Sequence, residues 1–319
     1  MTIVGIMVTK NAISQGYPFI ESIYSFLSWG DELYVADDSL DGTEKILNTL
    51  SKNSKIKLYK ISWGSFNSQR GEVIGKVYNS LLNKVRIEKG KKGWVFEVQA
   101  NEVFHEDSYE WLRKLQEIYK DKVEFVIPYI SLHGLYIVEF LWRLRFADMA
   151  RNIAIFGDAA SLNSKERYSF KKYLKIMVRE FWKNYVKTTD PYQRFFWYAT
   201  EGLMPVMLIP VYRYRVLLPL DTLKKHEGHL ELYKGQQSYV KMYNDVLKEY
   251  QQYKETLDMD KFWKSTSEDF CRMRNYASIY PLYLPLENHP KVMRKILVSK
   301  MEKYESIDHE ELINKIISL

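Results

Sequence analysis

At 319 residues the chain is long enough for one large domain or two modest ones, and its 46% hydrophobic and 27% charged residues are typical of a globular protein. The single cysteine, Cys271, excludes an internal disulfide and a cysteine-based metal cluster. The formal net charge of +7 indicates an anionic partner. Because no helix-turn-helix, zinc-finger or RNA-binding signature appears, we expect phosphorylated ligands and no nucleic acid.

The N-terminal part of the chain alternates between two hydrophobic patterns. Apolar runs of strand length are separated by runs whose apolar residues recur at helical spacing. We expect these elements at residues 3–8 (strand), 17–29 (helix), 33–36 (strand), 44–50 (helix), 56–61 (strand), 73–85 (helix) and 94–98 (strand). Strands that alternate with helices in this way predict an α/β fold with a mostly parallel central sheet flanked by helices on both faces.

The second expected strand ends in two adjacent carboxylates, Asp37 and Asp38, followed by Ser-Leu-Asp-Gly-Thr. A strand that stops at paired acids before a helix places polar groups at the carboxyl edge of a parallel sheet. Open α/β sheets bind their ligands at that edge. The alternative is a strand-to-helix turn whose Asp and Ser side chains only cap the next helix.

Together with two other segments, this one resembles family 2 glycosyltransferases. The runs VTKN, YPFIESIYSFLSWGDELYVADDSLDGTEKIL and WVFEVQANEVFHED follow that family's order and spacing over the first ~130 residues. The resemblance implies the GT-A fold, which is Rossmann-like, and a hexosyltransferase-like activity on a UDP or GDP sugar. It implies that Asp37 and Asp38 contact the base and ribose of this nucleotide sugar. Thr9, Asn11 and Asp41 are expected in the same pocket.

The match is incomplete at the position of the family's metal ligands. Where the family has Asp-Ala-Asp-Glu, this chain has Gln99, Ala100, Asn101 and Glu102, a degenerate form of the DxD element. Mg²⁺ and Mn²⁺ prefer charged oxygen ligands, so two amides bind these metals less well than two carboxylates.

Three outcomes of this change are open. A divalent metal binds weakly to Gln99, Asn101 and Glu102, with the donor's diphosphate supplying most of the negative charge. Alternatively, cationic side chains replace the metal, and the candidates are Lys10, Arg70 and Lys76. In the third case the protein binds a nucleotide sugar without turning it over.

The C-terminal half shares none of the family's clear motifs and is expected to be mainly α-helical. Residues 230–257 and 291–319 have the pattern of helices. Residues 203–220 are apolar but interrupted by prolines, which predicts a buried extended segment or a shallow membrane-contact hairpin. We expect a nucleotide-sugar-binding and catalytic core at 1–165, and a helical acceptor-side region at 166–319 packed on it.

Inverting glycosyl transfer needs a carboxylate near the acceptor hydroxyl as general base. Asp158 follows an apolar run, and Glu201 precedes the proline-interrupted segment. Asp158 is the preferred catalytic candidate because Gly157 before it lets the backbone approach a ligand closely. Helix capping or a surface ion pair is the alternative role of each carboxylate. His133 is a third candidate.

A basic amphipathic helix is expected at residues 168–187, where aromatic residues at helical spacing lie opposite Lys and Arg. Such a helix lies in a membrane interface or, more commonly, packs on its own domain. The sequence lacks a signal-peptide pattern and an apolar run of membrane-spanning length. We expect a cytoplasmic protein, with peripheral membrane contact as the alternative. The expected partners are a nucleotide sugar and a glycan, lipid or protein acceptor.

Overall fold

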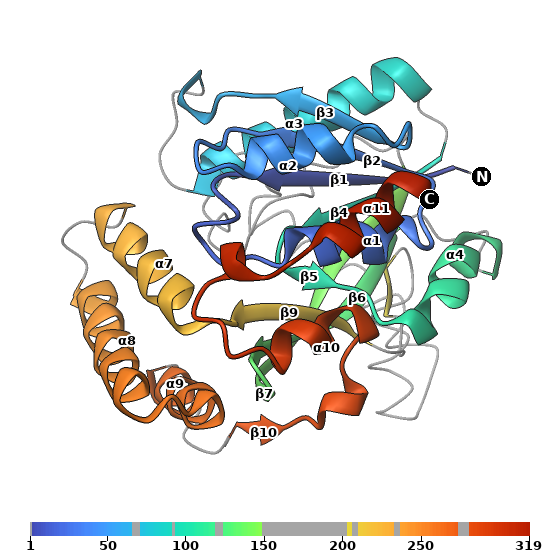
Figure 1. The fold of residues 1–319 in the computed structure, drawn as a ribbon. Helices are drawn as coiled ribbons and strands as arrows, with labels where there is room; N and C mark the ends of the chain where they lie inside the picture. The colour runs from blue at the N-terminus through green and yellow to red at the C-terminus, as the bar shows by residue number, and fades with distance from the viewer. Residues whose placement is uncertain are drawn as a thin grey trace, which may run out of the picture.

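The computed structural model of the protein describes residues 2–65, 71–90, 93–118, 124–148, 203–205, 210–232, 237–273 and 281–319. Asp158, Glu201, Arg70 and the basic helix expected at 168–187 lie outside these residues. Within the described residues, ten strands form one sheet, and helices cover both of its faces (Figure 1).

The strands of this sheet are β1 Ile3–Thr9, β2 Glu32–Asp37, β3 Ile56–Lys60, β4 Trp94–Gln99, β5 Glu102–Val103, β6 Glu124–His133, β7 Tyr136–Asp148, β8 Leu203–Pro205, β9 Val211–Val216 and β10 Leu282–Tyr283. They are ordered β3-β2-β1-β4-β7-β6-β9-β5, while β10 pairs with β7 and β8 pairs with β6. The helices are α1 Phe19–Leu27, α2 Thr43–Leu50, α3 Gly71–Lys89, α4 Tyr109–Ile118, α7 Pro219–Leu232, α8 Gln237–Thr256, α9 Met259–Met273, α10 Lys291–Leu297 and α11 Glu310–Ser318.

The first four strands confirm the expected α/β fold. β1 pairs in parallel with both β2 and β4, and β2 pairs in parallel with β3. Because these strands are parallel and in register, their carboxyl ends lie at one edge of the sheet. The loops that follow β1, β2, β3 and β4 therefore converge there.

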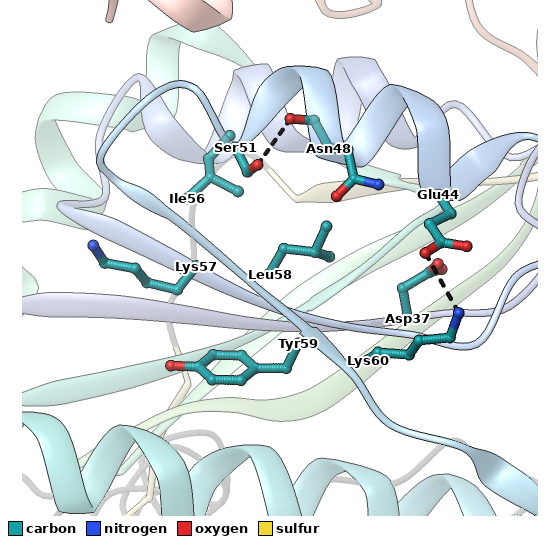
Figure 2. Close-up of a pocket in the computed structure, with 9 residues that line it drawn as sticks. All are labelled: Asp37, Glu44, Asn48, Ser51, Ile56, Lys57, Leu58, Tyr59 and Lys60. Atoms are coloured by element: carbon teal, nitrogen blue, oxygen red, sulfur yellow. Dashed lines mark hydrogen bonds and ion pairs between the residues drawn. The ribbon is translucent and has the colours of Figure 1, made fainter.

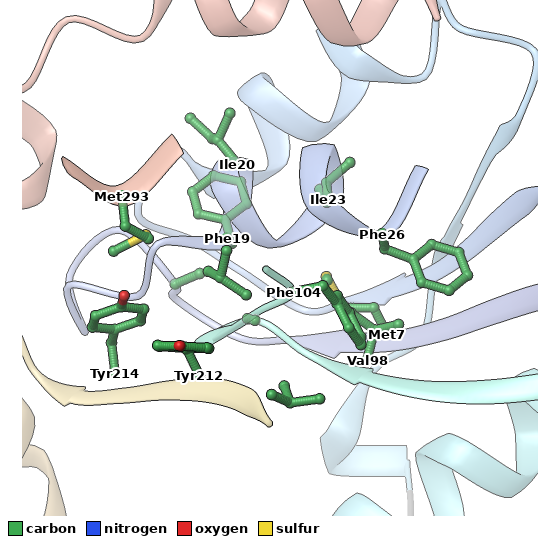
Figure 3. Packing of buried hydrophobic residues seen from close by; sticks show 14 of the residues in the cluster. Met7, Phe19, Ile20, Ile23, Phe26, Val98, Phe104, Tyr212, Tyr214 and Met293 are labelled. Carbon is green, nitrogen blue, oxygen red and sulfur yellow. The ribbon is translucent and has the colours of Figure 1, made fainter. Parts of the chain in front are cut away.

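Helices cover both faces of this parallel half because its strands are apolar on both sides. Ile3 and Met7 of β1 belong to the larger hydrophobic cluster, whereas Val4 and Ile6 pack on α3 in a second cluster. Figure 3 shows the larger cluster, in which side chains of α1 meet those of β4, β9 and α10. Each large side chain buried in this way stabilises the fold by about 1.5–3 kcal/mol.

The other half of the sheet is mixed and includes strands from the C-terminal part of the chain. β7 is antiparallel to β4 and to β6, and β9 is parallel to β6 and antiparallel to β5. β8 and β9 confirm that the described parts of residues 203–220 include extended segments, and the apolar side chains of β9 are buried. The sheet is thus shared by residues on both sides of the division expected near residue 165, which itself stays a prediction.

The mainly helical character of the C-terminal region is confirmed. α7, α8 and α9 pack in sequence, and α9 lies against β6 and β7 (Figure 1). Residues 291–319 contain two helices, α10 and α11, with a turn of 3-10 helix at Tyr304–Ser306 between them. The chain turns there to bury Tyr304, which is 1% exposed and donates its hydroxyl proton to Glu21 of α1 at 2.6 Å.

Among the described residues, no helix combines the length and the apolar character needed to cross a membrane.

Candidate functional site

The carboxyl ends of β1 and β2 meet at a buried carboxylate. Thr9 and Asp37 are paired in the register of these strands, with exposed fractions of only 1% and 4%. The hydroxyls of Thr9 and Ser39 both donate to Oδ1 of Asp37, at 2.7 and 2.6 Å, and the backbone N–H of Ser39 donates to Oδ2 at 3.3 Å. A carboxylate buried with several donors is stable in this position. Asp37 therefore holds the ends of β1 and β2 together at the carboxyl edge of the sheet.

Asn11 joins the loop after β1 to the loop after β2. Its backbone lies in the left-handed region, with φ of 53°, a conformation that Asn tolerates better than most residues. Its N–H donates to the Ser39 hydroxyl at 2.7 Å, and its side-chain Oδ1 accepts from the N–H of Leu40 at 2.8 Å. The two loops are thus clamped together, and the Leu40 side chain, which is 93% exposed, projects into solvent beside them.

Asp41 holds the start of helix α2 and lies just before its N-cap residue, Gly42. Its Oδ1 accepts from both the N–H and the hydroxyl of Thr43, at 3.1 and 2.6 Å, and its Oδ2 accepts from the N–H of Ser14 at 2.7 Å. Both carboxylate oxygens are therefore used to hold the two loops to the start of the helix. The capping alternative weighed from the sequence describes these contacts, and a ligand contact from Asp41 stays a prediction.

Asp38 lies on the other side of the same edge, where it joins three strand ends. Its Oδ2 pairs with the Lys10 ammonium at 3.2 Å and accepts from the backbone N–H of Trp63 at 3.0 Å. The Lys10 nitrogen also lies 5.1 Å from the centroid of the Trp63 ring, a cation–π distance. Sequence reasoning missed Trp63, although its position just after the third strand was a usable signal.

These side chains fall on two faces because successive residues of a strand alternate. Thr9 and Asp37 follow the face that packs on α1 and α2, with Met7 and Val35 of the larger cluster. Lys10 and Asp38 follow the face of α3, and Trp63 packs on that second cluster. The candidate site therefore comprises a buried, hydrogen-bonded side and a charged, partly exposed side.

The residues at the expected metal position make hydrogen bonds within the fold. The Asn101 side-chain N–H donates to the Tyr214 carbonyl at 3.2 Å, and the Tyr214 N–H donates to the Asn101 carbonyl at 2.9 Å. Asn101 is 5% exposed, and Glu102, in β5, is 1% exposed. Gln99 is only partly buried and donates to Glu97 at 3.2 Å.

This donor set does not fit a resident divalent metal, because it offers one buried carboxylate and two amides, of which one is committed to β9. No group of three or more His, Cys, Asp or Glu side chains in the described parts of the chain is arranged to hold a metal ion.

A groove of about 470 Å³ lies between α2 and β3, on the outer edge of the sheet (Figure 2). Asp37 lines one end of it, next to an exposed ion pair of Lys60 and Glu44 at 3.5 Å. Lys10, Asp38 and Trp63 are not among its lining residues. The groove therefore reaches the buried side of the candidate site but not the charged side.

Asp221 of α7 packs against the loop after β1. Gly16 has a positive φ of 62°, and a Cβ atom there would lie 2.4 Å from Cβ of Asp221. The carboxylate also accepts from the backbone N–H of Tyr304 at 2.5 Å. Burial raises the pKa of Asp221 to about 7, against a smaller lowering by the Tyr304 hydrogen bond.

Of the three catalytic candidates, only His133 is described. It is 4% exposed at the end of β6 and makes an edge contact with the Phe270 ring of α9. Burial lowers the pKa of its imidazole well below the ordinary value. A buried imidazole of this kind does not fit an acceptor-side base. Asp158 and Glu201 lie outside the described residues.

No protein-family model and no curated protein matches this chain. Among solved structures, Staphylococcus aureus TarS 1–349 in complex with UDP aligns with 100% of this chain and 90% of its own, at 11% identity and a TM-score of 0.35. The 4-diphosphocytidyl-2C-methyl-D-erythritol synthase of Anaerococcus prevotii aligns with 64% of this chain and 86% of its own, at 13% identity and a TM-score of 0.33. Likenesses with TM-scores this low carry no weight for the function of the chain.

Proposed function

We propose that the chain is a glycosyltransferase of the GT-A type, which moves a sugar from a UDP or GDP donor to an acceptor hydroxyl on a glycan, lipid or protein. The observation that carries the proposal is the meeting of polar residues from separate loops at the carboxyl edge of the parallel sheet. Thr9, Asn11, Asp37 and Asp38 are joined there by the contacts described above. This is the edge at which open α/β sheets bind nucleotides.

Within the proposed site the two acids have different tasks. Asp37 is a buried positioning residue, since its oxygens already accept from Thr9 and Ser39. Asp38 is the ligand-facing acid: its side chain is 22% exposed, and its contacts with Lys10 and the Trp63 backbone both use Oδ2. Oδ1 of Asp38 is therefore the acceptor that we assign to hydroxyls of the donor's ribose.

Transfer is proposed to proceed with inversion. A carboxylate, Asp158 or else Glu201, would take the proton of the acceptor hydroxyl as that oxygen attacks the anomeric carbon. The nucleoside diphosphate leaves with the electrons of the broken bond, and positive charge near it stabilises the departing group. The alternative is a protein that binds the donor without transferring its sugar. The neutral amides Gln99 and Asn101 at the expected metal position favour this alternative.

Calorimetry on the Asp38→Ala variant tests the pocket. We expect the unmodified chain to bind UDP or GDP and the variant to bind about tenfold more weakly, because the hydrogen bond between the ligand and the Asp38 carboxylate is lost. Glu32→Ala is the matched control, since Glu32 is a carboxylate of similar exposure that pairs with Lys89 at the opposite end of β2.

An affinity of Asp38→Ala equal to that of the unmodified chain would place the nucleotide elsewhere. Hydrolysis or transfer of a bound nucleotide sugar by the unmodified chain then separates the transferase from the binding protein.

A further inference from the structure

The charged side of the candidate site presents a lysine at the end of β1, the neighbour of the strand at whose end the resemblance implies a metal. β1 and β4 are parallel neighbours, and Val8 is paired with Gln99 in their register. Val8 packs on the α3 face of the sheet, and Gln99 shares this face with Val95, two residues before it. Lys10, two residues beyond Val8, lies at the carboxyl edge on the same face as Gln99.

Lys10 is held in place without being buried. Asp38 pairs with its ammonium at 3.2 Å, and the Trp63 ring lies under the nitrogen at 5.1 Å. An ammonium group has three N–H donors, so one ion pair leaves it able to donate to further oxygens. With 39% of its side chain exposed, Lys10 faces the solvent above the strand ends.

We propose that Lys10 binds the diphosphate of the donor and supplies the positive charge that a divalent metal supplies in relatives with intact carboxylates. This inference rests on the proposed function. Asp38 and Trp63 act as positioning residues that keep the ammonium at the edge. A diphosphate site that uses a lysine does not require two carboxylates at positions 99 and 101, where this chain has neutral amides.

Another described cation near this edge, Lys60 at the end of β3, is less well placed. Its ammonium pairs with Glu44 of α2 beside the groove, and its side chain is 73% exposed. The N-terminus of α3 begins at Gly71, after β3, and its backbone N–H groups favour a nearby anion. α3 lies on the same face of the sheet as Lys10.

The test is calorimetry with UDP and with uridine, which lacks phosphate, each in EDTA and in Mn²⁺. For the unmodified chain we expect UDP affinity in EDTA within about threefold of that in Mn²⁺. In Lys10→Met, UDP affinity should fall about tenfold or more while uridine affinity is kept, because only the charged contact is lost. Lys10→Arg should restore most of the UDP affinity.

Lys89→Met is the control, because it removes the same charge from an ion pair with Glu32 at the opposite end of β2 and should change UDP affinity little. Loss of UDP binding by the unmodified chain in EDTA, with recovery in Mn²⁺, would overturn the inference. This measurement does not need the variant, so it decides the question even if Lys10→Met fails to fold. An unchanged UDP affinity in a folded Lys10→Met would overturn it as well. If neither UDP nor uridine binds under any condition, the proposed function itself fails.

Discussion

At the scale of single residues, the candidate site shows how similar side chains acquire different tasks. Asp37 and Asp38 are adjacent, yet strand alternation sends one into a hydrogen-bonded, buried position and the other to a partly exposed ion pair. Asn101 departs further from expectation. A residue whose place in the sequence indicates a metal ligand instead bonds the backbone of Tyr214.

We predict that Asn101→Asp destabilises the fold and that a carboxylate at position 99 increases metal binding. The substitution at 101 replaces the N–H donor with a carboxylate oxygen that faces the Tyr214 carbonyl, at an expected cost of about 1–3 kcal/mol. Gln99→Asp places a carboxylate beside Glu97, which now accepts from the Gln99 amide at 3.2 Å, and should raise the affinity of the bare protein for Mn²⁺, which we expect to be poor. Urea unfolding of the first variant and a metal titration of the second measure the two effects. Unchanged stability of Asn101→Asp would contradict the role given to Asn101.

At the scale of elements, the C-terminal segment of α10, the turn Tyr304–Ser306 and α11 acts as a brace on the parallel half of the sheet and its helices. α11 packs on α1 and α2, and α10 packs on α1. The turn is fixed by two buried acids: Glu21 accepts from the Tyr304 hydroxyl, and Asp221 accepts from the Tyr304 N–H. Because Asp221 also touches Gly16, the brace supports the loop that carries Asn11.

The pH dependence of stability tests this brace. The pKa of Asp221 is about 7 in the folded protein, against 3.8 for an ordinary Asp, so the folded state holds its proton more tightly. Asp221 therefore contributes a stability that is complete below about pH 4 and falls as the pH rises to about 7, by at most about 1.4 kcal/mol per pH unit. Above about pH 7 the loss is complete and the contribution is constant.

Asp221→Asn keeps an oxygen that can accept from Tyr304 but removes the ionisation. We expect the stability of this variant relative to the unmodified chain to rise between about pH 4 and 7 and to level off above that range. Urea unfolding at several pH values measures the difference. Parallel stability curves for the two proteins would show that Asp221 does not titrate in this range.

At the scale of the whole molecule, one sheet unites the two halves of the sequence. β9 pairs with β6 and with β5, and Asn101 bonds to Tyr214 of β9. Tyr212 and Tyr214 also belong to the larger hydrophobic cluster, together with side chains of α1. A cut near residue 165 would leave β5 and β6 without this neighbour and would uncover part of the core.

We therefore predict that a fragment of residues 1–165 does not fold by itself. Unpaired strand edges and exposed core residues should give it a molten or aggregated state, visible as weak near-ultraviolet circular dichroism and an uncooperative thermal transition. The whole chain measured under the same conditions is the reference. A cooperative transition in the fragment would favour two separate domains.

The sequence by itself determined the local features of the protein. The strands of the parallel half, the helices between them and the position of Asp37 and Asp38 at a strand end follow from hydrophobic periodicity, which neighbouring residues carry. The carboxyl edge was predictable too, because strands alternating with helices form a parallel sheet.

Only the tertiary structure decided the contacts between distant residues. The ion pair of Lys10 and Asp38, the bond of Asn101 to Tyr214 and the turn that buries Tyr304 against Glu21 each join residues on different elements. No local pattern specifies such a partner, because the free energy of each contact depends on burial and geometry that arise when the elements pack. Lys10 therefore reads as one of several cations in the sequence, and the register of β1, β2 and β4 gives it a specific place.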